Sequence, residues 1–297
     1  MIKRIIIKRI IINLIAIIIT IIVMIFGYYM IIDIETKIPQ KANESCDIET
    51  KEFMSRKIFI IKPKTEQLSK KVILYFHGGA YVAEATTLHW DFLEKLANDT
   101  KSTIVMPDYP LTPKYTYKDV FNMVEPLYKE IISKVDVKNL VMMGDSAGGG
   151  ITLALAEKIS QNNIQLPSKT ILISPWLNVT LTNEKIKEVQ KNDKDLNKEK
   201  LLIAGISYAR DEEGMKSYLV NPINGPLSKL KNVIIYTGTY DILNPDTHLL
   251  QEKAKKEGID IQIKEYEQAP HIWIINNINK QDELQLKAYQ DLVCDIQ

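Results

Sequence analysis

The sequence predicts an α/β protein in which helices flank a mostly parallel central sheet. Short β-branched runs alternate along the chain with longer stretches of helical periodicity, which is typical of strand–helix–strand crossover units. The chain has 297 residues, of which 45% are hydrophobic and 25% charged, enough for one large domain or two small ones with a substantial core. A separate uncharged run, residues 10–32, precedes this pattern and predicts one further helix.

Seven strands and five helices are expected in alternation. The strands are Lys57–Lys62, Val72–Phe76, Thr103–Met106, Leu140–Met143, Thr170–Ile173, Val233–Tyr236 and Ile259–Tyr266. The helices lie near His89–Asn98, Tyr117–Ser133, Gly149–Gln161, Pro245–Glu257 and Lys280–Val293. Pro126 lies inside the second of these helices and should kink or split it, because proline cannot donate the helical hydrogen bond.

Residues 10–32 contain no charge, and this run is longer than the roughly 20 residues that a helix needs to cross a bilayer. Four basic residues precede it, whereas Asp33 and Glu35 follow it, which predicts a cytoplasmic N-terminus. No small-x-small cleavage site follows the run. We therefore expect residues 1–32 to be a basic tip and an uncleaved, single-pass signal anchor in the cell membrane, with the main domain on the extracytoplasmic side.

The rest of the chain divides into a short connecting segment and one large domain. Residues 33–55 are polar and suit a tether or part of a cap, and residues 56–297 form the main domain. Within that domain, about 176–225 contains no strand candidate, and Asn183–Lys200 is dense in Lys, Glu, Asp and Asn. This insertion is either a solvated helical excursion or a cap over the ends of the strands, and the two interpretations are compatible.

Charge and cysteine content exclude some classes of protein. The four basic residues before position 10 contribute +4 to a net charge of +1, which leaves the remainder of the chain at −3 and without a basic surface for nucleic acid.

Cys46 and Cys294 lie near the two ends of the expected exported part. We expect two free thiols; a disulfide is the alternative, because domain termini are often close and an oxidising compartment permits one.

Ser146 lies in the pentapeptide Gly144-Asp145-Ser146-Ala147-Gly148, which matches the pattern G-x-S-x-G. A predicted strand precedes the pentapeptide and a predicted helix follows it. This context is that of a nucleophile elbow, a strained turn that exposes a serine hydroxyl at the edge of a sheet. The helix N-terminus after the serine also favours developing negative charge. The alternative is a chance match in a glycine-rich turn.

A serine nucleophile needs a base that a third group orients. His271 follows the last predicted strand, and Asp241 follows the strand Val233–Tyr236, so both lie where ligands bind in parallel sheets. The order Ser146, Asp241, His271 is the one expected for a triad built on a nucleophile elbow. The rival acids are Asp246, for which a helix N-cap is the simpler role, and Glu265, inside a strand.

Acyl transfer also requires backbone N–H groups directed at the oxyanion of the tetrahedral intermediate. His77-Gly78-Gly79-Ala80 directly follows a strand, and its glycines can turn their amides inward. The residue after the nucleophile, Ala147, supplies another amide. We predict an oxyanion hole made by Gly78, Gly79 and Ala147, with a simple glycine turn as the alternative.

Six motifs in order, HGGA, PDYPLTP, GDSAGG, SPWLNVT, GTYDIL and PHIW, resemble the hormone-sensitive-lipase-like branch of the α/β-hydrolase esterases over about residues 55–295. The resemblance implies an α/β-hydrolase fold and hydrolysis of short-chain carboxylic esters through the triad and an acyl-enzyme, without cofactor or metal. It also implies a cap built from about 35–55 and 176–225. Ala80 replaces the third glycine of the usual motif, and Asp108–Lys114 lacks the usual arginine and glutamate, so altered loop packing is expected.

Four alternatives to an ester hydrolase remain open. The same fold and triad spacing serve deacetylases, lactonases and amidases, and a binding protein could reuse the fold without catalysis. The expected partners are a small ester substrate and the membrane through residues 10–32, with no nucleic acid. The sequence assigns neither the acyl length nor the oligomeric state.

Overall fold

The computed structural model describes residues 14–15, 17–18, 20–21, 33–276, 278 and 282–297. The expected membrane anchor, residues 10–32, lies largely outside these residues. Within the described part, no helix combines the length and the apolar character that crossing a membrane requires.

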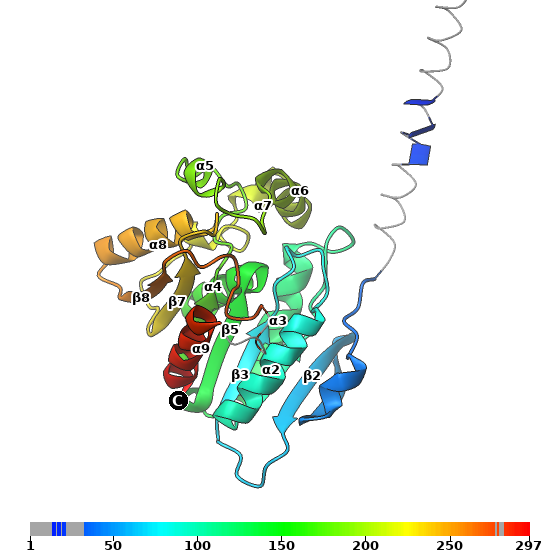
Figure 1. Ribbon diagram of the computed structural model, residues 1–297, viewed down its shortest axis with the longest axis vertical. Coiled ribbons are helices and arrows are strands. Elements are labelled where there is room, and N and C mark those ends of the chain that lie inside the picture. Colours follow the sequence, from blue (N-terminus) through cyan, green and yellow to red (C-terminus); the bar gives the residue numbers. More distant parts are fainter. Residues whose placement is uncertain (1–13, 16, 19, 22–32, 277, 279–281) are drawn as a thin grey trace, which may run out of the picture.

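Eight strands of the described chain form a single sheet (Figure 1). They are β1 Cys46–Phe53, β2 Arg56–Pro63, β3 Val72–Phe76, β4 Thr103–Pro107, β5 Leu140–Asp145, β6 Lys169–Ile173, β7 Val233–Gly238 and β8 Ile261–Tyr266. Their order is β1-β2-β4-β3-β5-β6-β7-β8. The six strands from β4 to β8 pair in parallel, and only β1 with β2 and β2 with β4 are antiparallel. The predicted mostly parallel sheet is confirmed.

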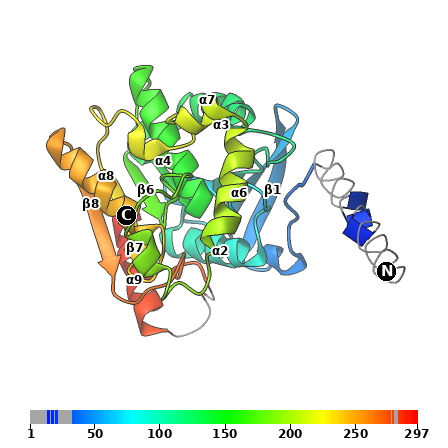
Figure 2. The same ribbon diagram turned by 90° about the horizontal axis from the view of Figure 1, so that it is seen from above.

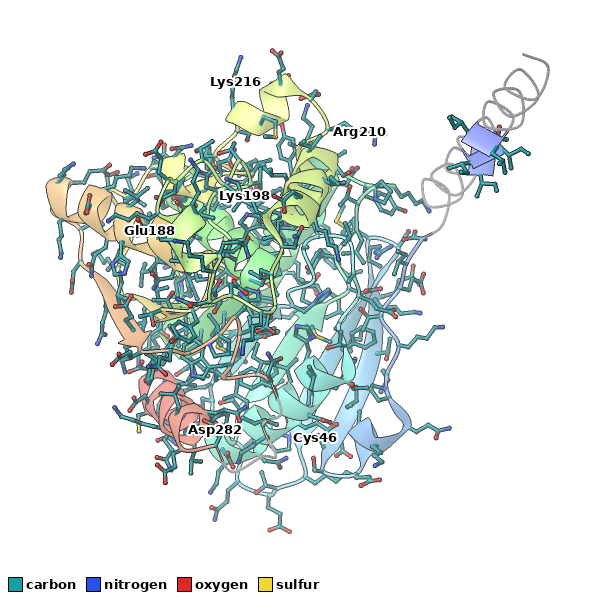
Figure 3. The ribbon with its side chains drawn as sticks, turned by 45° about the horizontal axis from the view of Figure 1, so that its top comes forward. Cys46, Glu188, Lys198, Arg210, Lys216 and Asp282 are labelled. Carbon is teal, nitrogen blue, oxygen red and sulfur yellow. The ribbon has the colours of Figure 1, made fainter. Side chains whose placement is uncertain are left out.

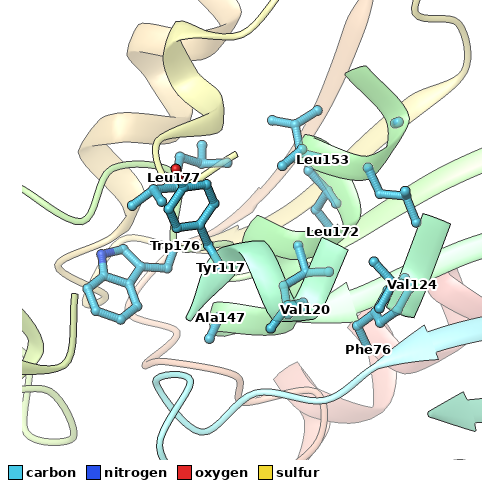
Figure 4. Packing of buried hydrophobic residues seen from close by; sticks show 14 of the residues in the cluster. Phe76, Tyr117, Val120, Val124, Ala147, Leu153, Leu172, Trp176 and Leu177 are labelled. Atoms are coloured by element: carbon cyan, nitrogen blue, oxygen red, sulfur yellow. The ribbon is translucent and has the colours of Figure 1, made fainter. Parts of the chain in front are cut away.

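Alternate residues of each inner strand face two separate hydrophobic cores. In β3, Leu74 and Phe76 belong to one core, and Ile73 and Tyr75 belong to the other. Burial on both faces explains why the inner strands read as continuous apolar runs. The first core packs against α3 (Tyr117–Ile132), α4 (Ser146–Gln161) and α8 (Asn244–Lys256), and part of it is shown in Figure 4. The second core packs against α2 (Thr87–Thr100) and α9 (Glu283–Ile296).

Strand β1 was not predicted, because residues 33–55 were expected to be a tether or part of the cap. Cys46 is its one fully buried residue, and most of the others are exposed. An edge strand of this kind carries charges that discourage pairing with other chains, and it lacks the alternating apolar pattern that marks a strand in a sequence. Its pairing with β2 runs from Cys46–Pro63 to Phe53–Arg56.

The predicted helices are present with shifted ends. The main differences are at α4, which begins at Ser146 and not at Gly149, and at α3, which continues past Pro126 without being split. Helix α2 begins earlier than predicted because Thr86 and His89 form a capping box. Helix α9 begins at Glu283, where the Asp282 side chain accepts a hydrogen bond from the Gln285 amide.

The insertion between β6 and β7 is helical, as predicted. It contains α5 (Ile186–Val189), α6 (Lys198–Ala209), α7 (Glu212–Lys216) and the short 3-10 helix η3 (Pro222–Asn224). Further 3-10 turns are η1 (Gln40–Asn43) and η2 (Val137–Asn139). Helices α5, α6 and α7 lie together above α4 and the sheet (Figures 1 and 2). We call residues 176–225 the cap.

Both cysteines are free thiols, as expected. Cys46 is buried at the start of β1, and Cys294 is exposed on α9. Figure 3 marks the position of Cys46. The disulfide considered from the sequence does not form in this structure.

Candidate active site

Ser146 lies at the junction between β5 and α4, where the strand passes into the helix without a loop. Its φ of 51° is in the left-handed region, which costs a residue with a side chain about 1–2 kcal/mol. The flanking glycines allow this tight junction. A Cβ at Gly148 would lie 2.0 Å from the carbonyl oxygen of Phe76, and a Cβ at Gly144 would lie 2.4 Å from that of Gly148. The local geometry is that of the predicted nucleophile elbow.

His271 lies on the loop after β8 and contacts both other members of the predicted triad. Its Nε2 atom is 3.0 Å from Oγ of Ser146, and its Nδ1 atom is 2.8 Å from Oδ2 of Asp241. A carboxylate only accepts hydrogen bonds, so Nδ1 carries the proton and Nε2 is left to accept the serine hydroxyl. The structure therefore brings Ser146, His271 and Asp241 together in one chain of hydrogen bonds.

The environment of His271 favours its protonated form. Burial alone would lower its pKa, but the charge of Asp241 and the hydrogen bond to it outweigh burial and raise the pKa above the usual value. Asp241 is fully buried, and its Oδ1 accepts a hydrogen bond of 2.9 Å from the amide of Leu243. The carboxylate is therefore held at both oxygens, one of which orients the imidazole.

The two rival acids point elsewhere. Asp246 accepts a hydrogen bond of 3.0 Å from the side chain of Asn183, and burial raises its pKa to about 6. The N-cap residue of α8 is Leu243, so the capping role expected for Asp246 is wrong. Glu265 accepts one hydrogen bond of 2.7 Å from the side chain of Asn244 and pairs at 2.7 Å with His248. Asp241 is the acid that contacts His271.

The predicted oxyanion donors need one correction. The amide of Gly78 donates a hydrogen bond of 2.9 Å to Oδ1 of Asp145, so it is already used and the prediction for Gly78 is wrong. Among the described residues, no hydrogen bond uses the amides of Gly79 and Ala80. Ala147 is the second residue of α4, where a helix leaves the amide without an internal acceptor. The candidate donors become Gly79, Ala80 and Ala147.

Ala80 could not be identified as a candidate donor from the sequence. Gly79, Ala80 and Tyr81 have φ values of 115°, 53° and 63°, three successive residues in the left-handed region. Only the first is a glycine, and alanine and tyrosine give no sequence signal for such backbone. Strain of this kind is concentrated at functional sites.

His77 supports this loop and does not contact the nucleophile. Its ring stacks on Tyr109 with the ring centroids 4.4 Å apart, and the hydroxyl of Tyr109 donates a hydrogen bond of 2.6 Å to its carbonyl oxygen. Burial lowers the pKa of His77 to about 4. The neutral ring lies with Nδ1 2.6 Å from the carbonyl oxygen of Gly78, and we infer that it steadies the loop.

The cap contacts the segments that carry Ser146 and Asp241, two members of the predicted triad. The amide of Trp176 donates to the carbonyl oxygen of Ser146 at 2.8 Å, and Oδ2 of Asp193 accepts from the amide of Ile242 at 2.8 Å. On α6, Tyr208 stacks on Tyr81 with the ring centroids 3.7 Å apart. Ser146 is only 6% exposed beneath these residues. In the described part of the chain, no group of three or more His, Cys, Asp or Glu side chains is arranged to hold a metal ion.

The fold and the Ser146–His271–Asp241 geometry are those of a hydrolase built on a nucleophile elbow. A family model described as alpha/beta hydrolase fold matches residues 73–275. The chain belongs to this family.

Several known proteins are similar to the chain. An esterase from Acinetobacter venetianus is 28% identical over 204 residues, covering 68% of this chain and 67% of that protein. An acetyl-hydrolase from Streptomyces hygroscopicus is 22% identical over 210 residues, which are 68% of each chain. The crystal structure of a Staphylococcus aureus protein assigned as an esterase superimposes with a TM-score of 0.81 at 27% identity, covering 88% of this chain and 87% of that one.

Proposed function

We propose that the protein is a serine carboxylic-ester hydrolase that works through an acyl-enzyme. The observation that carries the proposal is the continuous chain of hydrogen bonds from Ser146 through His271 to Asp241, with contacts of 3.0 and 2.8 Å. The names of the similar proteins, esterase and acetyl-hydrolase, support an ester as the bond that is cleaved. The structural neighbour assigned as an esterase supports the same class.

The mechanism follows from the positions of the protons. Nε2 of His271 takes the proton of the Ser146 hydroxyl as Oγ attacks the ester carbonyl carbon, and Asp241 stabilises the imidazolium that forms. The imidazolium then gives this proton to the leaving alcohol as the carbon–oxygen bond breaks. Water repeats both steps on the acyl-enzyme, which releases the acid and regenerates Ser146.

The developing oxyanion is the charge that the site must stabilise. The amides of Gly79, Ala80 and Ala147 are the candidates for this role, and the N-terminus of α4 adds a favourable partial charge. Removing one such donor from an oxyanion hole typically costs about 10²–10³-fold in kcat.

We propose a short acyl chain as the preferred substrate. Tyr81 follows the candidate donor Ala80 and is stacked between Trp176 and Tyr208, with ring centroids 5.3 and 3.7 Å away. The backbone amide of Trp176 donates to the carbonyl oxygen of Ser146, so the segment that carries this ring runs beside the nucleophile, and Ser146 is only 6% exposed. The acetyl-hydrolase among the similar proteins makes acetyl esters the first substrates to test.

The test is hydrolysis of p-nitrophenyl acetate, butyrate, octanoate and palmitate by the full-length protein in detergent, beside the variant Ser146→Ala. We expect turnover to fall with increasing chain length and to vanish in the variant. Turnover that rises toward palmitate would contradict the short-chain preference. A folded protein that cleaves anilides or acetylated sugars but none of these esters would instead be an amidase or a deacetylase.

We also propose that residues 10–32 anchor the enzyme in the cell membrane, with the hydrolase domain on the extracytoplasmic side. The charge pattern on either side of the uncharged run supports this orientation. The first acidic residue after the run, Asp33, is held by Arg56, Lys114 and Tyr115 at 2.6, 3.1 and 2.6 Å. A domain fixed to the chain at this point would lie directly against the bilayer.

The cap offers a surface that suits such a position. Arg210, at the end of α6, donates to the carbonyl oxygen of Pro113, next to Lys114. Helix α6 exposes Ile203 and Ile206, which are 68% and 57% accessible, and Lys198, Arg210 and Lys216 lie around this part of the cap (Figure 3). We expect the full-length protein to stay with membranes in alkaline carbonate and the domain to be cleaved by protease added to intact cells. Release by carbonate, or protection from the protease, would contradict this location or this orientation.

A further inference from the structure

Asp145 is a fully buried carboxylate that directly precedes the nucleophile. Its Oδ1 accepts hydrogen bonds from the hydroxyl of Tyr75 at 2.6 Å and from the amide of Gly78 at 2.9 Å. Its Oδ2 lies 3.3 Å from Nε2 of His89. Burying a charge away from water is costly unless the charge is paired and hydrogen-bonded. The contacts with Tyr75, Gly78 and His89 therefore offset the cost of burying the Asp145 carboxylate.

The capping box of α2 fixes the tautomer of His89, that is, which ring nitrogen carries the proton. The amide of Thr86 donates to Nδ1 of His89 at 3.0 Å, so Nδ1 accepts this bond. The ring proton is therefore on Nε2 and is donated to Asp145. His89 is 4% exposed, which keeps water from replacing this donor.

Asp145 in turn holds the loop that carries the candidate oxyanion donors. Gly78 is bonded to Asp145 and precedes Gly79 and Ala80, and a Cβ at Gly78 would lie 3.1 Å from Cβ of Ser146. The loop thus lies directly against the nucleophile. Both the hydrogen bond to Asp145 and the close approach to Ser146 fix the position of Gly78, and this holds the strained backbone that follows it. A second consequence is electrostatic, because an uncompensated carboxylate here would oppose the negative charge that develops on the substrate.

We propose that His89 is a positioning residue for ester hydrolysis: it acts through Asp145 to hold the loop 78–80 in register with Ser146. The inference rests on the proposed function, since it assigns a purpose to the loop within that reaction. His89 touches neither the substrate nor the triad. The oxyanion donors keep their places because the Nε2 proton of His89 satisfies the buried carboxylate behind them.

The test compares two variants of the full-length chain. His89→Asn retains an acceptor near the position of Nδ1 for the Thr86 amide, but it is too short to reach Asp145. His89→Gln extends an amide N–H toward the position of Nε2. Both are compared with the wild type for kcat and KM on p-nitrophenyl acetate and for inhibition by a boronic acid, whose tetrahedral serine adduct mimics the oxyanion intermediate.

We expect His89→Asn to lower kcat by about 10-fold or more, below the 10²–10³-fold cost of losing a donor outright, with KM changed by less than about threefold. Affinity for the boronic acid should fall in proportion to kcat, and His89→Gln should restore most of both. Equal loss in the two variants would show that ring packing matters and not the hydrogen bond. Unchanged boronic acid affinity in His89→Asn would equally overturn the proposal.

Two further measurements test the role of the bond between His89 and Asp145 separately from substrate turnover and from general damage to the fold. Hydrogen exchange of a peptide covering residues 77–83 should be faster in His89→Asn than in the wild type and in His89→Gln, and equal exchange in all three would refute the proposal without reference to any substrate. In the Asp145→Asn background, His89→Asn should cost much less than in the wild type, because the two residues act through one bond. A wild type that turns over no ester would remove the proposed function, and the exchange comparison would still decide the role of His89.

Discussion

Nε2 of His271 lies 3.0 Å from Oγ of Ser146, although 125 positions separate the two residues in the chain. They meet because β5 and β8 belong to the same parallel run of strands, and their carboxyl ends lie at one edge of the sheet. Asp241 follows β7, which pairs with β8, so the proposed base His271 and its proposed acid Asp241 follow adjacent strands. The contact is thus a product of sheet topology.

The acid of the triad can be tested by two matched substitutions. We expect Asp241→Asn to lower kcat for p-nitrophenyl acetate by about 10³–10⁴-fold, because the amide no longer fixes the Nδ1 proton of His271. Asp246→Asn removes a carboxylate that contacts Asn183 and not His271, and it should change kcat by less than about threefold. A large loss in Asp246→Asn alone would assign the acid to that residue.

The pH dependence of kcat/KM should report His271. Only its neutral form accepts the serine proton, so activity should rise with pH and level off, with a midpoint above 6.5 because Asp241 raises the pKa over the lowering effect of burial. In Asp241→Asn the midpoint should move down. A wild-type midpoint well below 6.5 would contradict the role of Asp241. The same shift makes the protonated pair stabilising below pH 6.5, and this stability is lost as pH rises through the raised pKa.

Gly148→Ala should disrupt the elbow for a steric reason. The new Cβ would approach the carbonyl oxygen of Phe76, a backbone atom that cannot turn away. Gly258→Ala is the control, because its φ of 72° disfavours a side chain while no atom lies within 4 Å of the new Cβ. We expect the thermal midpoint to fall much further in Gly148→Ala than in Gly258→Ala, with loss of activity only in the first. Equal shifts would mean that α4 can move away from β3.

Thiol titration should separate the two cysteines. Cys294 is exposed and should react with a thiol reagent within minutes, whereas Cys46 is buried and burial raises its pKa, which disfavours the reactive thiolate. We expect one reactive thiol per chain in the native protein and two in denaturant, measured by mass after alkylation. Two unreactive cysteines in denaturant would indicate the disulfide that the structure does not contain.

The sequence was sufficient to predict those parts of the fold in which the local pattern of apolar residues and glycines matches their burial in the structure. The inner strands have apolar runs because both faces are covered, and Ser146 is flanked by glycines that its tight junction requires. Strand β1 gave no such signal, because an exposed edge strand has no buried face to pattern. The sequence also favoured Asp241 over Asp246 and Glu265 as the acid that contacts His271. Of the three, only Asp241 was predicted to lie on a loop at the end of a strand.

The loop 78–80, which carries two of the candidate oxyanion donors, was less predictable because the use of each amide depends on tertiary contacts. Gly78 looked like a donor to substrate, but its amide is bonded to the carboxylate of Asp145. The left-handed backbone at Ala80 has no sequence signature. His89 looked like an ordinary residue at a helix start, and its second contact, to Asp145, joins segments that are 56 positions apart.

Asp193 of the cap accepts the amide of Ile242, the neighbour of Asp241, and also the amides of Asp195 and Leu196 within its own loop. One carboxylate thus joins the cap to the loop that carries Asp241, which contacts His271. Grafting the cap of another hydrolase onto this domain would therefore alter turnover as well as selectivity, unless a residue at position 193 kept the acceptor. Efforts to broaden the substrate range should vary α6 and leave this junction intact.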